Sequence, residues 1–226
     1  MLSAAVCWRD RHGSCTGLSP MTFELGVLVP TAWAESAGES ATQAMECLAR
    51  VGRGETLSVS VRFQRVRARW VEEALGRRDF GRVDGLELDG RQLGGGDEIA
   101  DAELAFAADL SCREWSWRCV LPARREIERV RVGAETRARI VREELRLEVG
   151  VRIAFAPVPE SPERRICVRV ANLTAADPLA DRAEGLRAAL LDVRVALALA
   201  EGTGVSSAPV PLALRGVLRS RALPAE

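Results

Sequence analysis

Four acidic residues near the middle of the chain could bind a hard cation through their carboxylate oxygens. They are Asp97, Glu98, Asp101 and Glu103. Calcium and magnesium prefer oxygen ligands, but this spacing lacks the alternating acids and the final glutamate of an EF-hand loop. We therefore interpret the segment Asp97–Glu103 as the start of a short acidic helix, where carboxylates interact favourably with the helix dipole. The sequence predicts no metal and no cofactor.

Six cysteines could supply a nucleophile or metal ligands, but the rest of the sequence argues against both. No C-x-x-C pair occurs, and the single histidine is His12. A catalytic thiolate or serine usually needs a neighbouring base, and a zinc site usually needs histidines or paired cysteines. We therefore expect no catalytic residue, and thiols that are free and mostly buried. The cysteines are Cys7, Cys15, Cys47, Cys112, Cys119 and Cys167.

Tryptophans provide the clearest candidate for a binding surface. Trp115 and Trp117 are two residues apart in an alternating run, so both indoles should lie on one face of a strand. Together with Trp70 and the neighbouring Arg118, they could form a platform for a base or a sugar. Core packing explains them as well, because an indole brings a large apolar area. The binding residues that the sequence suggests are Trp115, Trp117 and Arg118.

The charged residues balance and intermingle. The 226-residue chain has 32 arginines, no lysine and 32 acidic residues, so its formal net charge at pH 7 is zero. No polybasic arm or acidic tail occurs, and we expect neither nucleic acid nor a membrane as a partner. No apolar run reaches the about 20 residues that a membrane span needs, and Glu24 and Pro30 interrupt the segment that resembles a secretory signal. These features predict a cytoplasmic protein.

Two alternating segments predict an antiparallel β-hairpin in the second half of the chain. Apolar residues alternate with polar or small ones over residues 145–155 and again over residues 166–171. A period of two is typical of a strand with one buried face. The break Pro157–Glu163 between them is short and rich in turn-forming residues. We expect this hairpin to be the spine of a sheet.

Further alternating runs predict other strands. Residues 57–63 and 66–70 have apolar residues of opposite parity, which we interpret as one long strand bent by a β-bulge. Trp115–Leu121 predicts another strand, and Val83–Gly90 predicts a short strand flanked by turns. Ile127–Val132 fits either a strand or a turn of helix.

Two longer helices are predicted from apolar residues spaced by three and four. The first lies within Ala34–Arg53, with Ser40 as its N-cap. The second is Asp181–Glu201, which begins with capping-box spacing between Asp181 and Glu184 and continues with an apolar face. That face consists of Leu186, Leu190, Val193 and Leu197.

These elements predict an α+β fold. We expect an antiparallel β-sheet of about five to seven strands, covered by the single C-terminal helix Asp181–Glu201. Residues 21–206 would form a single domain. Residues 1–20 would be a disordered leader or an over-extended gene start, and residues 207–226 a poorly ordered tail.

Several short motifs follow one another in a recognisable order. A basic strand precedes two Asp-Gly turns and an acidic segment, and an apolar strand and the predicted helix come later. They are Val61–Trp70, Asp84-Gly85, Leu88-Asp89-Gly90, Asp97-Glu98-Ile99-Ala100, Val168–Thr174 and Leu186–Leu191. Their order and spacing resemble a family of uncharacterised actinobacterial proteins, over roughly Leu57 to Ser207.

The chain departs from that family at three points. Gly96 stands where members usually carry a tryptophan, and Arg194 lies where the late helix typically has a histidine before a Leu-Leu pair. Members also continue into a second half, so the resemblance implies a chain that is truncated or frameshifted near Ser207. It implies no activity, because we know of none for the family.

The sequence as a whole favours a binding function over catalysis. We expect a non-enzymatic cytoplasmic binding or scaffold module that engages a protein partner through a strand edge or a helix. One alternative is an enzyme or accessory fragment whose active residues lie in a missing C-terminal half or in a partner subunit. Another is a small-ligand binder that uses the Trp115/Trp117 face. The ligand, the partner and the oligomeric state do not follow from the sequence.

Overall fold

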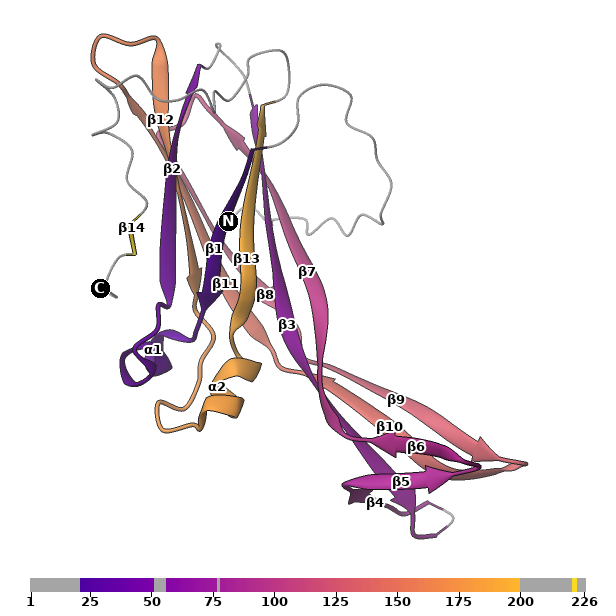
Figure 1. The fold of residues 1–226 in the computed structure, drawn as a ribbon. Coiled ribbons are helices and arrows are strands. Elements are labelled where there is room, and N and C mark those ends of the chain that lie inside the picture. The colour runs from indigo at the N-terminus through magenta and orange to yellow at the C-terminus, as the bar shows by residue number, and fades with distance from the viewer. Residues whose placement is uncertain (1–20, 51–55, 77, 200–220, 223–226) are drawn as a thin grey trace.

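A computed structural model describes residues 21–50, 56–76, 78–199 and 221–222. Within them the chain forms two antiparallel β-sheets that pack face to face, and an arm of strands projects from one end (Figure 1). The predicted leader, residues 1–20, lies outside the described residues, and so does most of the predicted tail.

The first sheet has seven strands, and β3 (Thr56–Ala74) lies at its centre. The strand order is β1-β13-β3-β10-β9, and β4 and β7 also pair with β3. The bounds of its other strands are β1 Met21–Leu28, β4 Phe80–Val83, β7 Gly96–Asp109, β9 Arg124–Val132, β10 Glu135–Glu144 and β13 Leu190–Leu199.

The second sheet has five strands in the order β14-β2-β12-β11-β8, while β5 and β6 form a separate hairpin. Their bounds are β2 Thr42–Arg50, β5 Gly85–Leu88, β6 Arg91–Gly94, β8 Glu114–Leu121, β11 Leu147–Pro157, β12 Glu163–Asn172 and β14 Arg221–Ala222. Two short helices, α1 (Thr31–Ala37) and α2 (Arg182–Arg187), lie at one end of the sandwich (Figure 1). Among the described helices, none has the length and apolar character that crossing a bilayer requires.

β3 is nineteen residues long and belongs both to the sandwich and to the arm. Its first part pairs with β7 and β13, and its last part pairs with β10 and β4. We call β4, β5, β6, β9, β10 and the last part of β3 the arm. One long strand is therefore confirmed.

The predicted β-bulge in β3 is wrong. The pairing with β7 runs from Thr56 to Arg69 without a shift. The apolar parity changes for another reason: the inner face of β3 carries arginines at positions 65, 67 and 69 where the strand leaves the sandwich. The apolar residues Val66 and Trp70 lie on the opposite face, because side chains alternate along a strand.

The main core lies between the two sheets. Leu57 of β3, Leu190 of β13 and Ile153 of β11 are completely buried there. The predicted hairpin is confirmed, since β11 and β12 pair antiparallel over residues 149–157 and 164–172. Its apolar face packs against the first sheet and not against a helix.

The predicted α+β class is wrong, because the described chain is mostly antiparallel strand and no long helix covers a sheet. Of the described residues of the predicted helix Asp181–Glu201, only the six of α2 are helical, and β13 follows. The N-cap is confirmed: the side chain of Asp181 accepts a hydrogen bond from the backbone N–H of Glu184 at 2.8 Å.

A local irregularity in β13 explains why this segment resembles a helix. Asp192 has a φ of 47°, in the left-handed region, and the pairing with β3 shifts between Leu191 and Arg194. Leu190 and Val193 therefore lie on the same buried face although they are three residues apart. The sequence spacing of a helix arises from a strand with one irregular step.

The other two predicted helices are also wrong. In Ala34–Arg53, helix α1 ends at Ala37 and β2 follows. β2 has buried residues on both faces, such as Cys47 on one and Leu48 on the other, which imitates helical spacing. The segment Asp97–Glu103 lies in β7.

The remaining predicted strands are present. Trp115–Leu121 lies within β8, and Val83–Gly90 contains β5. Ile127–Val132, which the sequence left open between strand and helix, belongs to β9.

A buried amide joins several segments at the helical end of the sandwich. The side chain of Asn172 donates from Nδ2 to the carbonyl oxygens of Leu28, at 2.9 Å, and Ala188, at 2.8 Å. Its Oδ1 accepts from the backbone N–H of Thr174 at 3.0 Å. Asn172 is completely buried, so it satisfies three backbone groups that water does not reach.

We predict that Asn172→Ala lowers the free energy of unfolding by about 3 kcal/mol, because it leaves those buried groups without partners. Urea unfolding followed by tryptophan fluorescence measures this loss. Gln92→Ala is the matched control, since that amide is exposed and its side chain donates to the exposed carboxylate of Glu87, and its effect should stay within about 0.5 kcal/mol. Equal effects of the two substitutions would contradict the structural role of Asn172.

Candidate functional site

The structure brings two of the three suggested binding residues together. The indoles of Trp115 and Trp117 stack with centroids 5.8 Å apart and an interplanar angle of 9°. Phe106 of β7 packs against Trp117 at 4.8 Å, and the Trp115 indole donates to the carbonyl oxygen of Asp109 at 2.9 Å. These half-buried rings close the side of the sandwich between β7 and β8.

Arg118 and Trp70 do not belong to this aromatic cluster. Arg118 lies on the opposite face of β8 and pairs with the buried carboxylate of Glu148. Trp70 lies in the arm, where its indole is near the guanidinium groups of Arg82, at 5.3 Å, and Arg125, at 5.7 Å. The predicted platform is therefore divided, and ligand binding by Trp115, Trp117 and Arg118 stays a prediction.

The four acids considered as cation ligands are separated by the alternation of β7. Glu98 faces inward, where its carboxylate lies 3.1 Å from the guanidinium groups of Arg69 and Arg142. Asp97, Asp101 and Glu103 face outward. Within the described residues, no three side chains of histidine, cysteine, aspartate or glutamate are placed to hold a metal ion.

The described cysteines are free. Burial, assisted by the neighbouring Cys167, raises the pKa of Cys47 to about 12. Burial also raises the pKa values of Cys119 and Cys167. These three thiols therefore stay protonated at neutral pH, which makes them poor nucleophiles. Cys112 is exposed.

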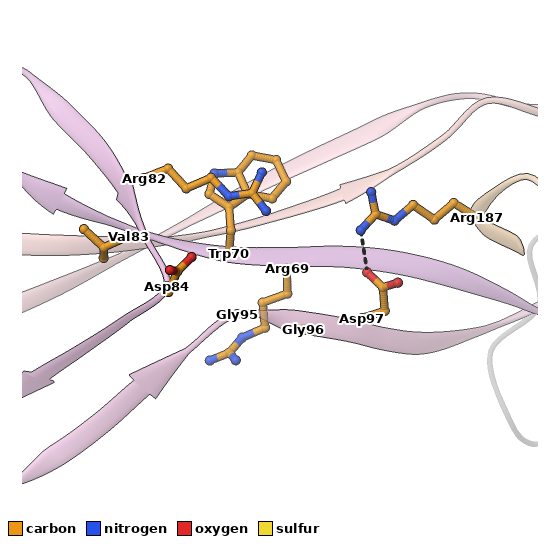
Figure 2. Close-up of a pocket in the computed structure, with 9 residues that line it drawn as sticks. All are labelled: Arg69, Trp70, Arg82, Val83, Asp84, Gly95, Gly96, Asp97 and Arg187. Atoms are coloured by element: carbon orange, nitrogen blue, oxygen red, sulfur yellow. Dashed lines mark hydrogen bonds and ion pairs between the residues drawn. The ribbon is translucent and has the colours of Figure 1, made fainter. Parts of the chain in front are cut away.

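A polar pocket of about 370 Å³ lies where the arm meets the sandwich (Figure 2). Three of its charged side chains have polar partners: Arg187 lies 3.2 Å from Asp97, and Arg69 donates to the carbonyl oxygen of Gly94 at 2.5 Å. Arg82 lies over the Trp70 ring, with its guanidinium carbon 5.3 Å from the ring centroid. An anion bound by Arg69 or Arg187 would have to displace these contacts. The lining residues are Arg69, Trp70, Arg82, Val83, Asp84, Gly95, Gly96, Asp97 and Arg187.

This pocket was not predicted from the sequence, although Trp70 was noted as an aromatic candidate. Arg82 and Arg187 are 105 positions apart in the chain, and no local motif connects them. They come together because α2 contacts the central strand at the base of the arm. The pocket lies at Trp70 and not at the Trp115/Trp117 face, so it does not join those indoles to acidic residues.

Strand edges are the other feature that can recruit a ligand. Among the described strands of the two sheets, six pair with a single neighbour: β1, β4, β7, β8, β9 and β14. Of these, β4 has only four residues and β14 only two. An unpaired edge presents backbone donors and acceptors that another extended segment can satisfy. Of these six edges, β7 is the longest, with fourteen residues and no shift in its pairing with β3.

A carboxylate beside the pocket is strongly held by its neighbours. Glu72 of β3 accepts hydrogen bonds from the Trp70 indole, at 2.8 Å, and from Arg139. Burial alone would raise the pKa of Glu72, but these hydrogen bonds and the charges of Arg139 and Arg125 lower it below the ordinary value.

We predict that protonation of Glu72 contributes to the loss of stability in acid. Because its pKa is lower in the folded chain, ionised Glu72 contributes stability above its unfolded pKa of about 4.3. That contribution is lost as the pH falls through the lower, folded value. Urea unfolding at a series of acidic pH values should show a smaller loss of stability for Glu72→Gln than for the native chain.

Glu73→Gln, on the other face of the same strand, serves as the control and should keep the native pH dependence. If Glu72→Gln and the native chain lose stability in acid to the same extent, Glu72 has no such role.

Comparisons with protein-family models, curated proteins and solved structures give no match to this chain. The resemblance to an actinobacterial family therefore stays a prediction from the order of sequence motifs, and functional proposals depend on the geometry described above.

Proposed function

We propose that the protein is a non-enzymatic cytoplasmic binding module, and that it engages a protein partner by accepting an extended segment along the free edge of β7. In this mode, backbone hydrogen bonds supply affinity and the alternating side chains supply specificity. The single observation that carries the proposal is the difference between β7 and the other described edges.

The other edges have features that oppose strand addition. In β9, six of the nine residues are charged, with both signs present. β1 pairs with irregular steps around Gly26, and β8 has only eight residues before Pro122 follows. Charges, irregularities and short length are the usual protections of an edge strand.

β7 is neither short nor irregular, and its charged residues are all acidic rather than of both signs. Its ladder with β3 is regular over fourteen residues, and the segment 104–108 contains only leucine, alanine and phenylalanine. Ala105 and Ala107 face outward and are exposed. A strand added here would meet a backbone without bulges and small outward side chains, so little steric obstruction opposes it.

The described side chains support binding more than catalysis. The acids considered as catalytic or metal-binding groups are paired with arginines or with a glutamine, and the buried thiols have raised pKa values. The pocket at Trp70 is polar, and two of its three arginines, Arg69 and Arg187, have polar partners. No specific observation favours a second function.

The proposal predicts position-specific crosslinking in cells. A photoreactive phenylalanine analogue placed at Ala105 or Ala107 should form an adduct with one and the same protein, because both positions border the β7 edge. The same analogue at Arg129, on the β9 edge, should give no such adduct. Mass spectrometry identifies the adduct.

The identified protein should then slow hydrogen exchange of β7 amides when it is added to the purified chain, because it satisfies their hydrogen bonds. Adducts that are identical at Ala105 and Arg129, or protection that spares β7, would refute the β7 edge as the binding surface.

A further inference from the structure

The outer face of β7 carries charges of one sign. Asp97, Asp101 and Glu103 all point outward, and the described strand contains no basic residue. The groups that interact with them come from β3 and from α2, and not from β7 itself. An added strand would therefore lie directly beside carboxylates.

The compensation on the β3 side is incomplete. Glu103 lies 3.1 Å from Arg62 and accepts a hydrogen bond from Ser60 at 2.5 Å. Asp101 receives only the neutral amide of Gln64, at 3.3 Å. These two acids are two residues apart, so they lie on one face and would meet alternate residues of an antiparallel neighbour.

The inner face at the same edge is apolar. Leu104 and Ala102 are buried, and the half-exposed rings of Phe106, Trp115 and Trp117 lie between β7 and β8. The inward side chains of an added strand would contact this aromatic cluster. Apolar residues suit that position, because they would remove indole surface from water.

We infer that the segment accepted by β7 alternates basic and apolar residues, with arginine or lysine facing Asp101 and Glu103 and apolar side chains facing the aromatic cluster. This inference rests on the proposed function, because it describes the partner of the same edge. It combines two independent observations, the unbalanced acids of the outer face and the aromatic surface of the inner face.

A second copy of the chain fits this edge poorly. In an antiparallel pair with two-fold symmetry, residues at equal distances from the centre face each other. If the two-fold axis passes beside residue 101, 102, 103 or 105, at least one carboxylate of β7 lies opposite a carboxylate of the second copy. With the axis beside residue 103, for example, Glu103 faces Glu103 of the other copy. Among axis positions from residue 101 to residue 105, only the one beside Leu104 keeps the carboxylates apart. Like charges that face each other destabilise a sheet, so a basic partner is favoured over self-association.

The test measures the binding of short labelled peptides to the purified full chain by fluorescence anisotropy. In the first peptide arginine alternates with valine, in the second threonine replaces arginine, and in the third glutamate replaces it. A single added strand is smaller than a standard interface of about 1,600 Å², so we expect a Kd in the range of about 1–100 μM for the arginine peptide. The glutamate peptide should bind at least about tenfold more weakly.

Matched variants locate the effect. Asp101→Asn combined with Glu103→Gln keeps side-chain size and should weaken the arginine peptide by about three- to tenfold while leaving the threonine peptide unchanged. Glu126→Gln combined with Glu128→Gln removes two acids from β9 and should change the binding of neither the arginine peptide nor the threonine peptide. Circular dichroism confirms that each variant is folded.

Three results would overturn the inference. The first is equal binding of the arginine and glutamate peptides, and the second is an equal loss in the β7 and β9 variants, which indicates general attraction of a cation. The third is a dimer whose crosslinks map to β7. If the threonine peptide binds β7 as well as the arginine peptide does, the charge preference fails and the proposed function stands. If no peptide binds and no adduct forms at Ala105, both fail.

Discussion

The length of β3 is the constraint on which the rest of the structure depends. At about 3.3 Å per residue its nineteen residues extend about 60 Å, whereas β2, β8, β11 and β12 have only eight to eleven residues. The second sheet therefore ends before β3 does, and the remaining part needs other partners. β10 and β4 take its two edges, and Val71 packs with Ile140 of β10 and Leu93 of β6 in a second small core. The arm therefore forms because β3 extends beyond the end of the sandwich.

Charged side chains, and not apolar ones, occupy the passage between the two cores. The side chains of Arg65 and Glu144 are 7% and 8% exposed and lie 3.2 Å apart. Burial lowers the pKa of Arg65, and the charge of Glu144 opposes that shift. Such a buried pair contributes little net stability, but loss of one partner costs about 3–5 kcal/mol. A slip of β3 against β10 would separate the charges, so we infer that the pair fixes the register of the arm more than it strengthens it.

Sequence reasoning succeeded where one face of a strand is buried in a regular ladder. The hairpin of β11 and β12 and the strand β8 show period-two alternation, and their pairing has no irregular step. It failed where the period is broken or masked. In β13 the left-handed conformation of Asp192 gives the buried apolar residues a spacing that resembles that of a helix. In β2 the burial of both faces produces a similar spacing. Of the candidate site, the shared face of Trp115 and Trp117 could be predicted, whereas the free edge of β7 could not, because an edge depends on which strands become neighbours.

The two longest edge strands of the first sheet, β7 and β9, both leave backbone hydrogen-bonding groups unpaired, and their side-chain charges affect strand addition in different ways. β9 carries charges of both signs, and two-fold pairing centred on Ile127 would place Arg125 opposite Arg129 and Glu126 opposite Glu128. A strand that carries charges of one sign would be repelled by some of the β9 side chains, so the edge of β9 disfavours the addition of such a strand. β7 carries acids alone, which repel another acidic strand but attract a basic one. A charge pattern of one sign therefore does not block the edge of β7; it selects which strand can occupy it.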